Sequence, residues 1–189
     1  MSSFVGRLKE RLKANTPRNV SEKKVEVRAL IRSGVLGIPN NLSEPLILIS
    51  VGAGISVFRG MLQERQEEKS FSSTGEVYVY YGCKKKDSPY VNELTSWEVK
   101  GIINKLDIAF SQEDEPKVHV QDILKAQKND IYNLIKEKNA TIMVCASLSV
   151  EQNIKEALIE VFKHREKNPN ALFEQIKSEK RYMKQLWNY

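Results

Sequence analysis

The sequence predicts an α/β fold: a five-stranded parallel sheet, doubly wound and Rossmann-like, with an N-terminal helical extension. From Pro45 onward, apolar runs of strand length alternate with helical patterns, and such alternation gives a parallel sheet with helices on both faces. The first run, Leu46–Ile49, is continuously apolar, as in a strand buried on both faces. Two glycines, Gly52 and Gly54, follow this run, and a helical pattern begins near Val57.

The remaining elements follow from the same patterns. Strands are expected near 46–51, 76–82, 102–108 and 140–145, with a short last strand near Leu186. Helices are expected near 57–69, 87–100, 119–137, 149–165 and 170–181. Sheets of this kind bind ligands outside the carboxyl ends of their strands. We therefore expect Gly52–Gly54, Cys83, Ser111 and Cys145 to converge on one crevice.

Residues 1–23 are predicted to form a basic amphipathic extension. Phe4, Leu8 and Leu12 recur at helical spacing, and basic residues occupy the other faces. Such a helix resembles a mitochondrial targeting segment, and it equally suits a docking helix that lays its apolar stripe on a partner subunit. A frayed terminus is the third alternative. Residues 24–44 read as a strand, Val25–Ile31, and a linker, and residues 45–189 read as the main domain.

Composition excludes several classes of function. The chain of 189 residues has a net charge of +6, and no apolar run approaches the roughly 20 residues that cross a bilayer. With only two cysteines and two histidines, the sequence predicts a reducing compartment, no disulfide framework and no metal site. The basic cluster Lys84–Lys86 suits a solvated loop, a nucleotide phosphate, or an acidic protein or polymer. Nucleic acid is disfavoured because no aromatic residue is interleaved with these lysines.

The glycine turn is the strongest candidate binding element. A strand, a glycine turn and a helix N-terminus together direct backbone N–H groups at a phosphate, and glycine lets the ligand approach the backbone. The same turn also occurs in α/β domains that bind no ligand at this position.

Five ordered segments resemble one family. Ser50–Arg65 resembles the GPGTGIAPFRGFLQER element of the NADPH-binding domain of diflavin reductases, in the ferredoxin–NADP reductase superfamily. The other four matches are residues 80–87, residues 109–121, Val144-Cys145, and the C-terminal Arg181-Tyr182 with Trp187. The resemblance implies the fold of that superfamily's C-terminal domain and an NAD(P)-binding-like domain over residues 45–189.

The resemblance implies a dinucleotide site with altered contacts. Its cofactor-binding positions here are Gly52, Ala53, Gly54, Cys83, Ser111, Lys117, His119 and Gln121. Ser111 and Lys117 match groups that hold the adenosine 2′-phosphate in the family, whereas Gln112 replaces an arginine and His119 a tyrosine. Because glutamine supplies no charge, either NADPH or NADH is a possible cofactor.

The positions near the nicotinamide differ more. Cys145 keeps the family's cysteine near the hydride-transfer position, but Ser147 and Gln185 replace acids. Trp187 matches the aromatic residue that covers the flavin ring. Cys145 and Trp187 are the only family-matching catalytic positions, and the element that binds FAD in the family is expected to be missing from this chain.

These observations predict a degenerate NADPH-binding domain that serves as a structural or accessory subunit of a larger assembly and is not a reductase alone. The alternative is the nucleotide-binding half of a split oxidoreductase whose FAD lies on a flavoprotein partner. Electrostatic binding to an acidic polymer is a third interpretation. An intracellular location is expected, with mitochondria slightly favoured over a cytosolic or cytoskeletal assembly.

Overall fold

The computed structural model describes Leu36, Pro39 and residues 43–67, 75–86, 88–113 and 115–187. The chain divides into two units, Met1–Ser33 and Gly34–Tyr189, and every described residue belongs to the second. The predicted amphipathic extension with Phe4, Leu8 and Leu12, and the predicted strand Val25–Ile31, lie outside the described residues. Those expectations therefore stay predictions.

The predicted five-stranded parallel sheet is confirmed. Its strands are β1 (Leu46–Val51), β2 (Val77–Cys83), β3 (Lys105–Phe110), β4 (Thr141–Ser147) and β5 (Tyr182–Trp187). They are hydrogen-bonded in the order β3-β2-β1-β4-β5, and every pair is parallel. Strand β1 is central because the chain builds outward to β3 and then returns to the other side of β1 with β4. In the register, Ser50 of β1 lies opposite Tyr81 on one side and Cys145 on the other.

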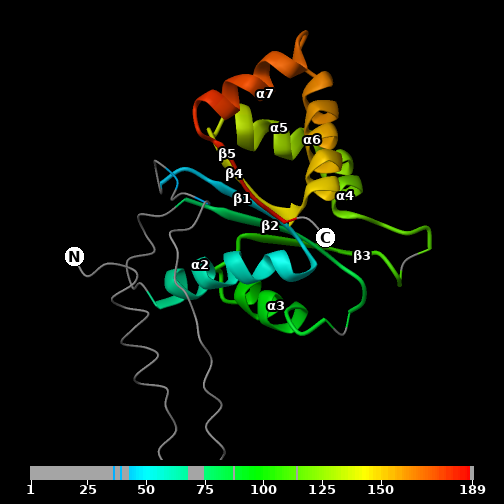
Figure 1. Cartoon of the computed structure of the whole chain (residues 1–189). Coiled ribbons are helices and arrows are strands. Elements are labelled where there is room, and N and C mark those ends of the chain that lie inside the picture. The colour runs from blue at the N-terminus through cyan, green and yellow to red at the C-terminus, as the bar shows by residue number, and fades with distance from the viewer. Residues whose placement is uncertain are drawn as a thin grey trace, which may run out of the picture. The chain divides into compact units, whose positions relative to one another are not determined.

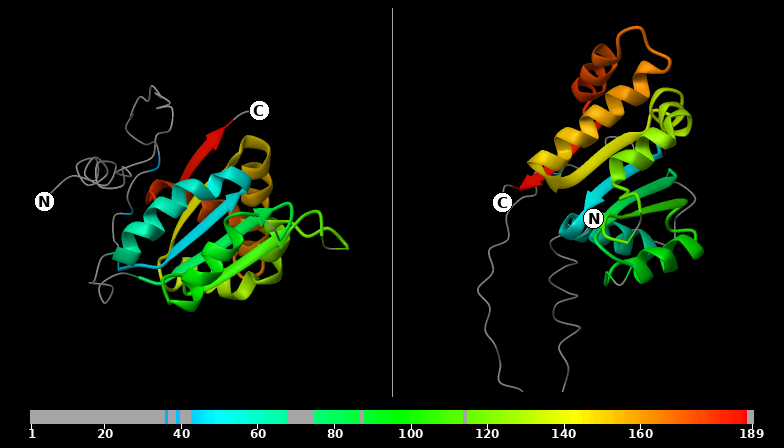
Figure 2. Two further views of the ribbon diagram at one scale, coloured as in Figure 1. Left: turned by 90° about the horizontal axis from the view of Figure 1, so that it is seen from below. Right: turned by 90° about the vertical axis from the view of Figure 1, so that its right-hand side faces the viewer.

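Helices cover both faces of the sheet (Figure 1). The helical elements are η1 (Gly52–Gly54), α2 (Ile55–Glu67), α3 (Val91–Val99), α4 (Val120–Ala126), α5 (Lys128–Lys136), α6 (Leu148–Lys163) and α7 (Pro169–Ser178). Helices α2 and α3 lie on one face, and α4 to α7 lie on the other, as the two further views in Figure 2 also show. This is the doubly wound arrangement that the alternating sequence pattern predicts.

Each face of the sheet has its own apolar core. On the α2/α3 side, Phe58 and Trp97 pack with Leu48 of β1. On the other side, Phe162 and Phe173 pack with Ile49 and its neighbours. Because alternate residues of β1 serve opposite cores, both sets of side chains are buried, and this is why the run Leu46–Ile49 is apolar without a break. Ser50, near the end of the strand, is a buried polar exception.

Most of the predicted elements have different bounds in the structure, and three examples follow. The single helix expected over 119–137 is two helices, α4 and α5, which meet at Gln127. The strand expected over 102–108 begins at Lys105, because Ile102 and Ile103 instead close the end of α3 by donating their backbone N–H groups to the Trp97 carbonyl. The short strand expected near Leu186 is a six-residue edge strand that starts at Tyr182.

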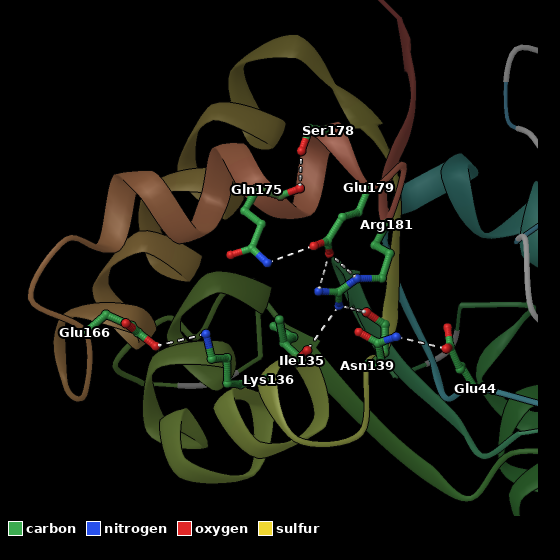
Figure 3. Close-up of polar contacts among 10 residues, drawn as sticks. Glu44, Ile135, Lys136, Asn139, Glu166, Gln175, Ser178, Glu179 and Arg181 are labelled. Atoms are coloured by element: carbon green, nitrogen blue, oxygen red, sulfur yellow. Dashed lines mark hydrogen bonds and ion pairs between the residues drawn. The ribbon is translucent and has the colours of Figure 1, made fainter.

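Arg181 anchors the start of that edge strand (Figure 3). Its guanidinium, with the residue only 9% exposed, donates from Nη1 to the backbone carbonyls of Ile135 and Ala140, each at 3.0 Å. Its Nε donates to the Glu179 carboxylate at 2.9 Å. One side chain therefore ties the entry of β5 to the end of α5 and to the residue that precedes β4.

Candidate functional site

A crevice lies where the strands end at their carboxyl edge. The direction of chain winding reverses between β1 and β4, and such a switch point is where open α/β sheets bind ligands. The crevice has a volume of about 610 Å³ and receives residues from the carboxyl ends of all five strands. Its size falls within the roughly 300–1,000 Å³ that small-molecule and cofactor sites occupy.

At the floor of the crevice lies Gly52, the first residue of the glycine turn. Gly52 has a φ of +57°, a conformation that side chains disfavour, so this glycine lets the backbone turn sharply out of β1. The Ser56 hydroxyl donates to the Ala53 carbonyl at 2.8 Å and braces the turn from the first residues of α2. Gly52 lines the crevice, so the backbone at the start of this helical segment is exposed to a ligand.

Gly54 lies beneath the turn in a space that admits no side chain. A Cβ there would lie 2.1 Å from the Cys145 carbonyl oxygen and 2.9 Å from a ring carbon of Trp187. The turn therefore packs directly on the backbone of β4, with the Trp187 ring beside it. Gly54 serves this close approach and is itself buried.

The wall toward β3 carries most of the polar side chains of the crevice among apolar ones. It includes Cys83 and Lys84 from the end of β2, and Ser111, His119 and Gln121 from the segments around β3 and α4. The Ser111 backbone N–H donates to the Cys83 carbonyl at 2.9 Å, and this bond joins the two strand ends at the crevice rim. His119 caps α4, with its N–H donated to the Asp122 carboxylate at 2.9 Å.

The wall toward β5 contains Ser147, Val150, Asn153 and Trp187. Behind it, the buried Glu151 carboxylate accepts from the Tyr182 hydroxyl at 2.9 Å and from Lys184 Nζ at 3.1 Å. Burial, together with this carboxylate, raises the pKa of the Tyr182 phenol far above its usual value, so the hydroxyl stays a hydrogen-bond donor. These contacts hold β5, and with it Trp187, against α6.

A second hollow of about 480 Å³ adjoins the crevice and shares Gly52, Cys83 and Lys84 with it. Ala53 lines this second hollow, together with Lys85 and Gln112. Between them, the two hollows include seven of the sequence-predicted site residues: Gly52, Ala53, Cys83, Ser111, His119, Gln121 and Trp187. That these residues bind a nucleotide stays a prediction.

Besides Gly54, which is buried beneath the turn, two predicted residues line neither hollow. Lys117 is exposed and lines neither hollow. Cys145 lies two residues before the end of β4, is 1% exposed and faces the α2/α3 core. Burial raises the pKa of its thiol to about 11, which leaves it protonated and unreactive near neutral pH. The predicted strand ended at residue 145, whereas β4 continues to Ser147, which is the residue that reaches the crevice.

The sequence reasoning missed Val150 and Asn153. They are three residues apart in α6 and so share one face of its first two turns, directly after the end of β4. The usable signal is positional, because the helix that follows a strand at the switch point begins beside the crevice.

Within the described part of the chain, no three or more His, Cys, Asp or Glu residues are grouped as a metal site would require. None of the described helices combines the length and apolar character needed to span a bilayer.

Comparison with known proteins identifies relatives. Residues 48–156 match the family model described as oxidoreductase NAD-binding domain. The chain is 32% identical over 137 residues to NADPH–cytochrome P450 reductase of Sus scrofa, a match that covers 71% of this chain and 20% of that protein. It is 30% identical over 185 residues to the Drosophila melanogaster reductase of the same name, covering 94% of this chain and 27% of that protein. The matched region is thus about a quarter of these relatives or less.

Proposed function

The chain belongs to the oxidoreductase NAD-binding domain family, in the diflavin reductase branch, and from this premise we propose that it binds a pyridine dinucleotide in the strand-end crevice as an accessory subunit of a larger assembly. The observation that carries this proposal is the crevice itself. It lies at the switch point and has Gly52 at its floor.

The residues present fit a dinucleotide. The backbone at Gly52 suits the pyrophosphate, because it is exposed at the start of a helical segment whose dipole favours negative charge. Lys84 adds a cation on the rim shared by the two hollows. The residues that line the crevice include no aspartate or glutamate, so among the described residues no lining carboxylate opposes an anion there.

The residues near the ends of β4 and β5 support an accessory role. A bound reduced dinucleotide supplies a hydride, and transfer requires an acceptor ring held in contact geometry. At the β4 and β5 ends, this chain offers Ser147 and Gln185 where a carboxylate could assist transfer, and the Cys145 thiol faces away into the core. Of these three residues, Ser147 lines the crevice and can orient a nucleotide, and none of the three is a ready proton donor or acceptor.

The alternative is the nucleotide-binding half of a split flavin-dependent oxidoreductase. The observation in its favour is Trp187, which is half-buried at the end of β5 and lines the crevice. An aromatic ring in that place could cover a flavin carried by a second subunit. On this alternative, adding the flavoprotein partner and NADH or NADPH should bleach the flavin absorbance, and on the accessory proposal it should not.

Calorimetric titration of the chain with NADH and NADPH tests the binding proposal. Asn153→Trp places a large ring at the crevice from an exposed position on α6, and should weaken binding about tenfold or more, a loss of about 1.4 kcal/mol. The matched control is Gln152→Trp, on the adjacent exposed residue that does not line the crevice. No binding of either nucleotide, or an equal effect of both substitutions, would remove the proposal.

Partners and location are part of the same proposal. The support for a docked extension is the apolar stripe of Phe4, Leu8 and Leu12 among basic residues. Substituting all three with serine should release the chain from its assembly in a pull-down and leave nucleotide binding unchanged. Fluorescent tagging at the C-terminus would test whether the location is mitochondrial or cytosolic.

A further inference from the structure

Positive charge is scarce along the crevice, and from this we infer that it selects the pyridine dinucleotide without a 2′-phosphate, that is, NADH over NADPH. The inference rests on the proposed function and specifies its ligand. Lys84 is the one lysine among the residues that line the crevice, the adjoining hollow adds Lys85, and arginine is absent from both sets of described residues. The two dinucleotides share a pyrophosphate, and NADPH adds a phosphate ester of roughly −1.5 to −2 charge at neutral pH.

Lys84 lies where the pyrophosphate needs it. It shares the rim between the two hollows with Gly52, the residue whose backbone faces the crevice at the helical N-terminus. An exposed lysine is a strongly hydrated point charge, so its attraction is divided among whatever anions lie near it. Its neighbour Lys85 lines the second hollow alone, and Lys86 is placed over the Phe110 ring, 5.6 Å from the centroid, and lines neither hollow.

His119 supplies no free positive charge for a second phosphate. Its Nδ1 lies 3.6 Å from the Asp122 carboxylate, which also accepts the His119 backbone N–H. A protonated imidazole is therefore already paired, and a phosphate dianion placed beside it would also meet the Asp122 charge. Dinucleotide sites that take the free 2′-hydroxyl commonly place a carboxylate at the ribose, whereas those that take the 2′-phosphate place an arginine.

Gln112 is the neutral residue that an arginine could replace. It lines the second hollow beside Lys84 and Lys85, and its backbone N–H donates to the Lys84 carbonyl at 3.0 Å, so the main chain here is fixed. Its amide can donate to a phosphate but adds no charge, and a guanidinium in its place would donate two aligned, charge-assisted bonds.

Calorimetric titrations at one fixed salt concentration test the inference. The chain should bind NADH more tightly than NADPH. Gln112→Arg should tighten NADPH binding about tenfold or more, the usual scale of a charged hydrogen bond, and change NADH binding less than about twofold. The charge-matched control is Gln175→Arg on α7, an exposed position that lines neither hollow, and it should leave the NADH to NADPH ratio unchanged.

Asp122→Asn gives a second, independent test. Asparagine keeps an oxygen that can accept the His119 N–H and removes only the charge, so NADPH binding should tighten and NADH binding should not. If the chain binds NADPH as tightly as NADH, or more tightly, the inference is overturned while the proposed function stands. If it binds neither nucleotide, both are overturned.

Discussion

The guanidinium of Arg181 should be among the largest single contributors to the stability of this domain. Arg181→Leu removes two hydrogen bonds of 3.0 Å to the Ile135 and Ala140 carbonyls and leaves both oxygens in a place that water does not easily reach. Each hydrogen bond from a charged donor contributes about 1.5–3 kcal/mol, and removing the desolvation cost of the buried charge offsets part of the sum. The expected loss in the free energy of unfolding is about 3 kcal/mol.

Urea denaturation followed by far-ultraviolet circular dichroism measures this loss. In a domain of this size, the same loss of about 3 kcal/mol should also lower the melting temperature by about 6–12 °C. The control is Glu179→Gln, which removes the partly exposed charge that pairs with Arg181 and keeps its two bonds to the carbonyls. That control should cost at most about 1 kcal/mol. A loss below about 1 kcal/mol for Arg181→Leu, with an unchanged denaturant slope, would refute the idea that these bonds anchor β5.

Three further predictions concern the crevice and its supports. Gly54→Ala should destabilise the domain by at least about 2 kcal/mol, because the new Cβ would lie 2.1 Å from the Cys145 carbonyl oxygen. As a control in the same urea assay, Gly60→Ala lies in open space on α2 and should stabilise the domain by about 0.5–1 kcal/mol. The pKa of the Cys145 thiol is raised from 9.0 to about 11, so between these pH values the unfolded chain releases a proton that the folded chain keeps. The free energy of unfolding should therefore fall as pH rises through that window, and unfolding curves of Cys145→Ala should show a shallower fall. Glu151→Gln should lower the free energy of unfolding by about 1–3 kcal/mol, because it removes the carboxylate charge that accepts the Tyr182 hydrogen bond at a residue only 3% exposed. An unchanged melting temperature in thermal unfolding would argue against this prediction.

The sheet was predictable from the sequence because its central strands are buried on both faces. The bounds expected for β1, 46–51, are those observed, since every residue of that run but the last is buried. Ile102 and Ile103 misled the same reasoning. Their side chains are as apolar and as buried as those of a central strand, but they pack beneath α3, in the turn that ends this helix.

The break between α4 and α5 is a tertiary effect that local pattern does not contain. Gln127 leaves the helical conformation, and its side chain joins a network on the sheet. Its carbonyl oxygen accepts from the Tyr80 hydroxyl at 3.1 Å and from Lys105 at 2.7 Å, and its amide donates to Asp107 at 2.9 Å. Three partners on β2 and β3 thus fix one residue, and periodicity along the helix gives no sign of them.

The candidate site was predictable where it depends on which strands end at the crevice. It was unpredictable where it depends on the exact residue at which a strand ends. Gly52, Cys83, Ser111 and Trp187 line the crevice because parallel strands finish at one edge. Cys145 does not line it, because β4 continues two residues beyond the expected end. Where a strand stops decides which side chain is presented, and composition alone does not determine that position to within two residues.

The two walls of the crevice differ in how firmly the sheet holds them. Strand β1, which carries the glycine turn, is bonded along its length to β2 and to β4, whereas β5 is the outermost strand and is bonded to β4 alone. Native-state opening should therefore start at β5, with the amides of Met183 to Leu186 exchanging with deuterium well before those of Ile47 to Ile49. One wall of the crevice is therefore fixed by a central strand, and the other is carried by an edge strand that can open without disturbing the glycine turn.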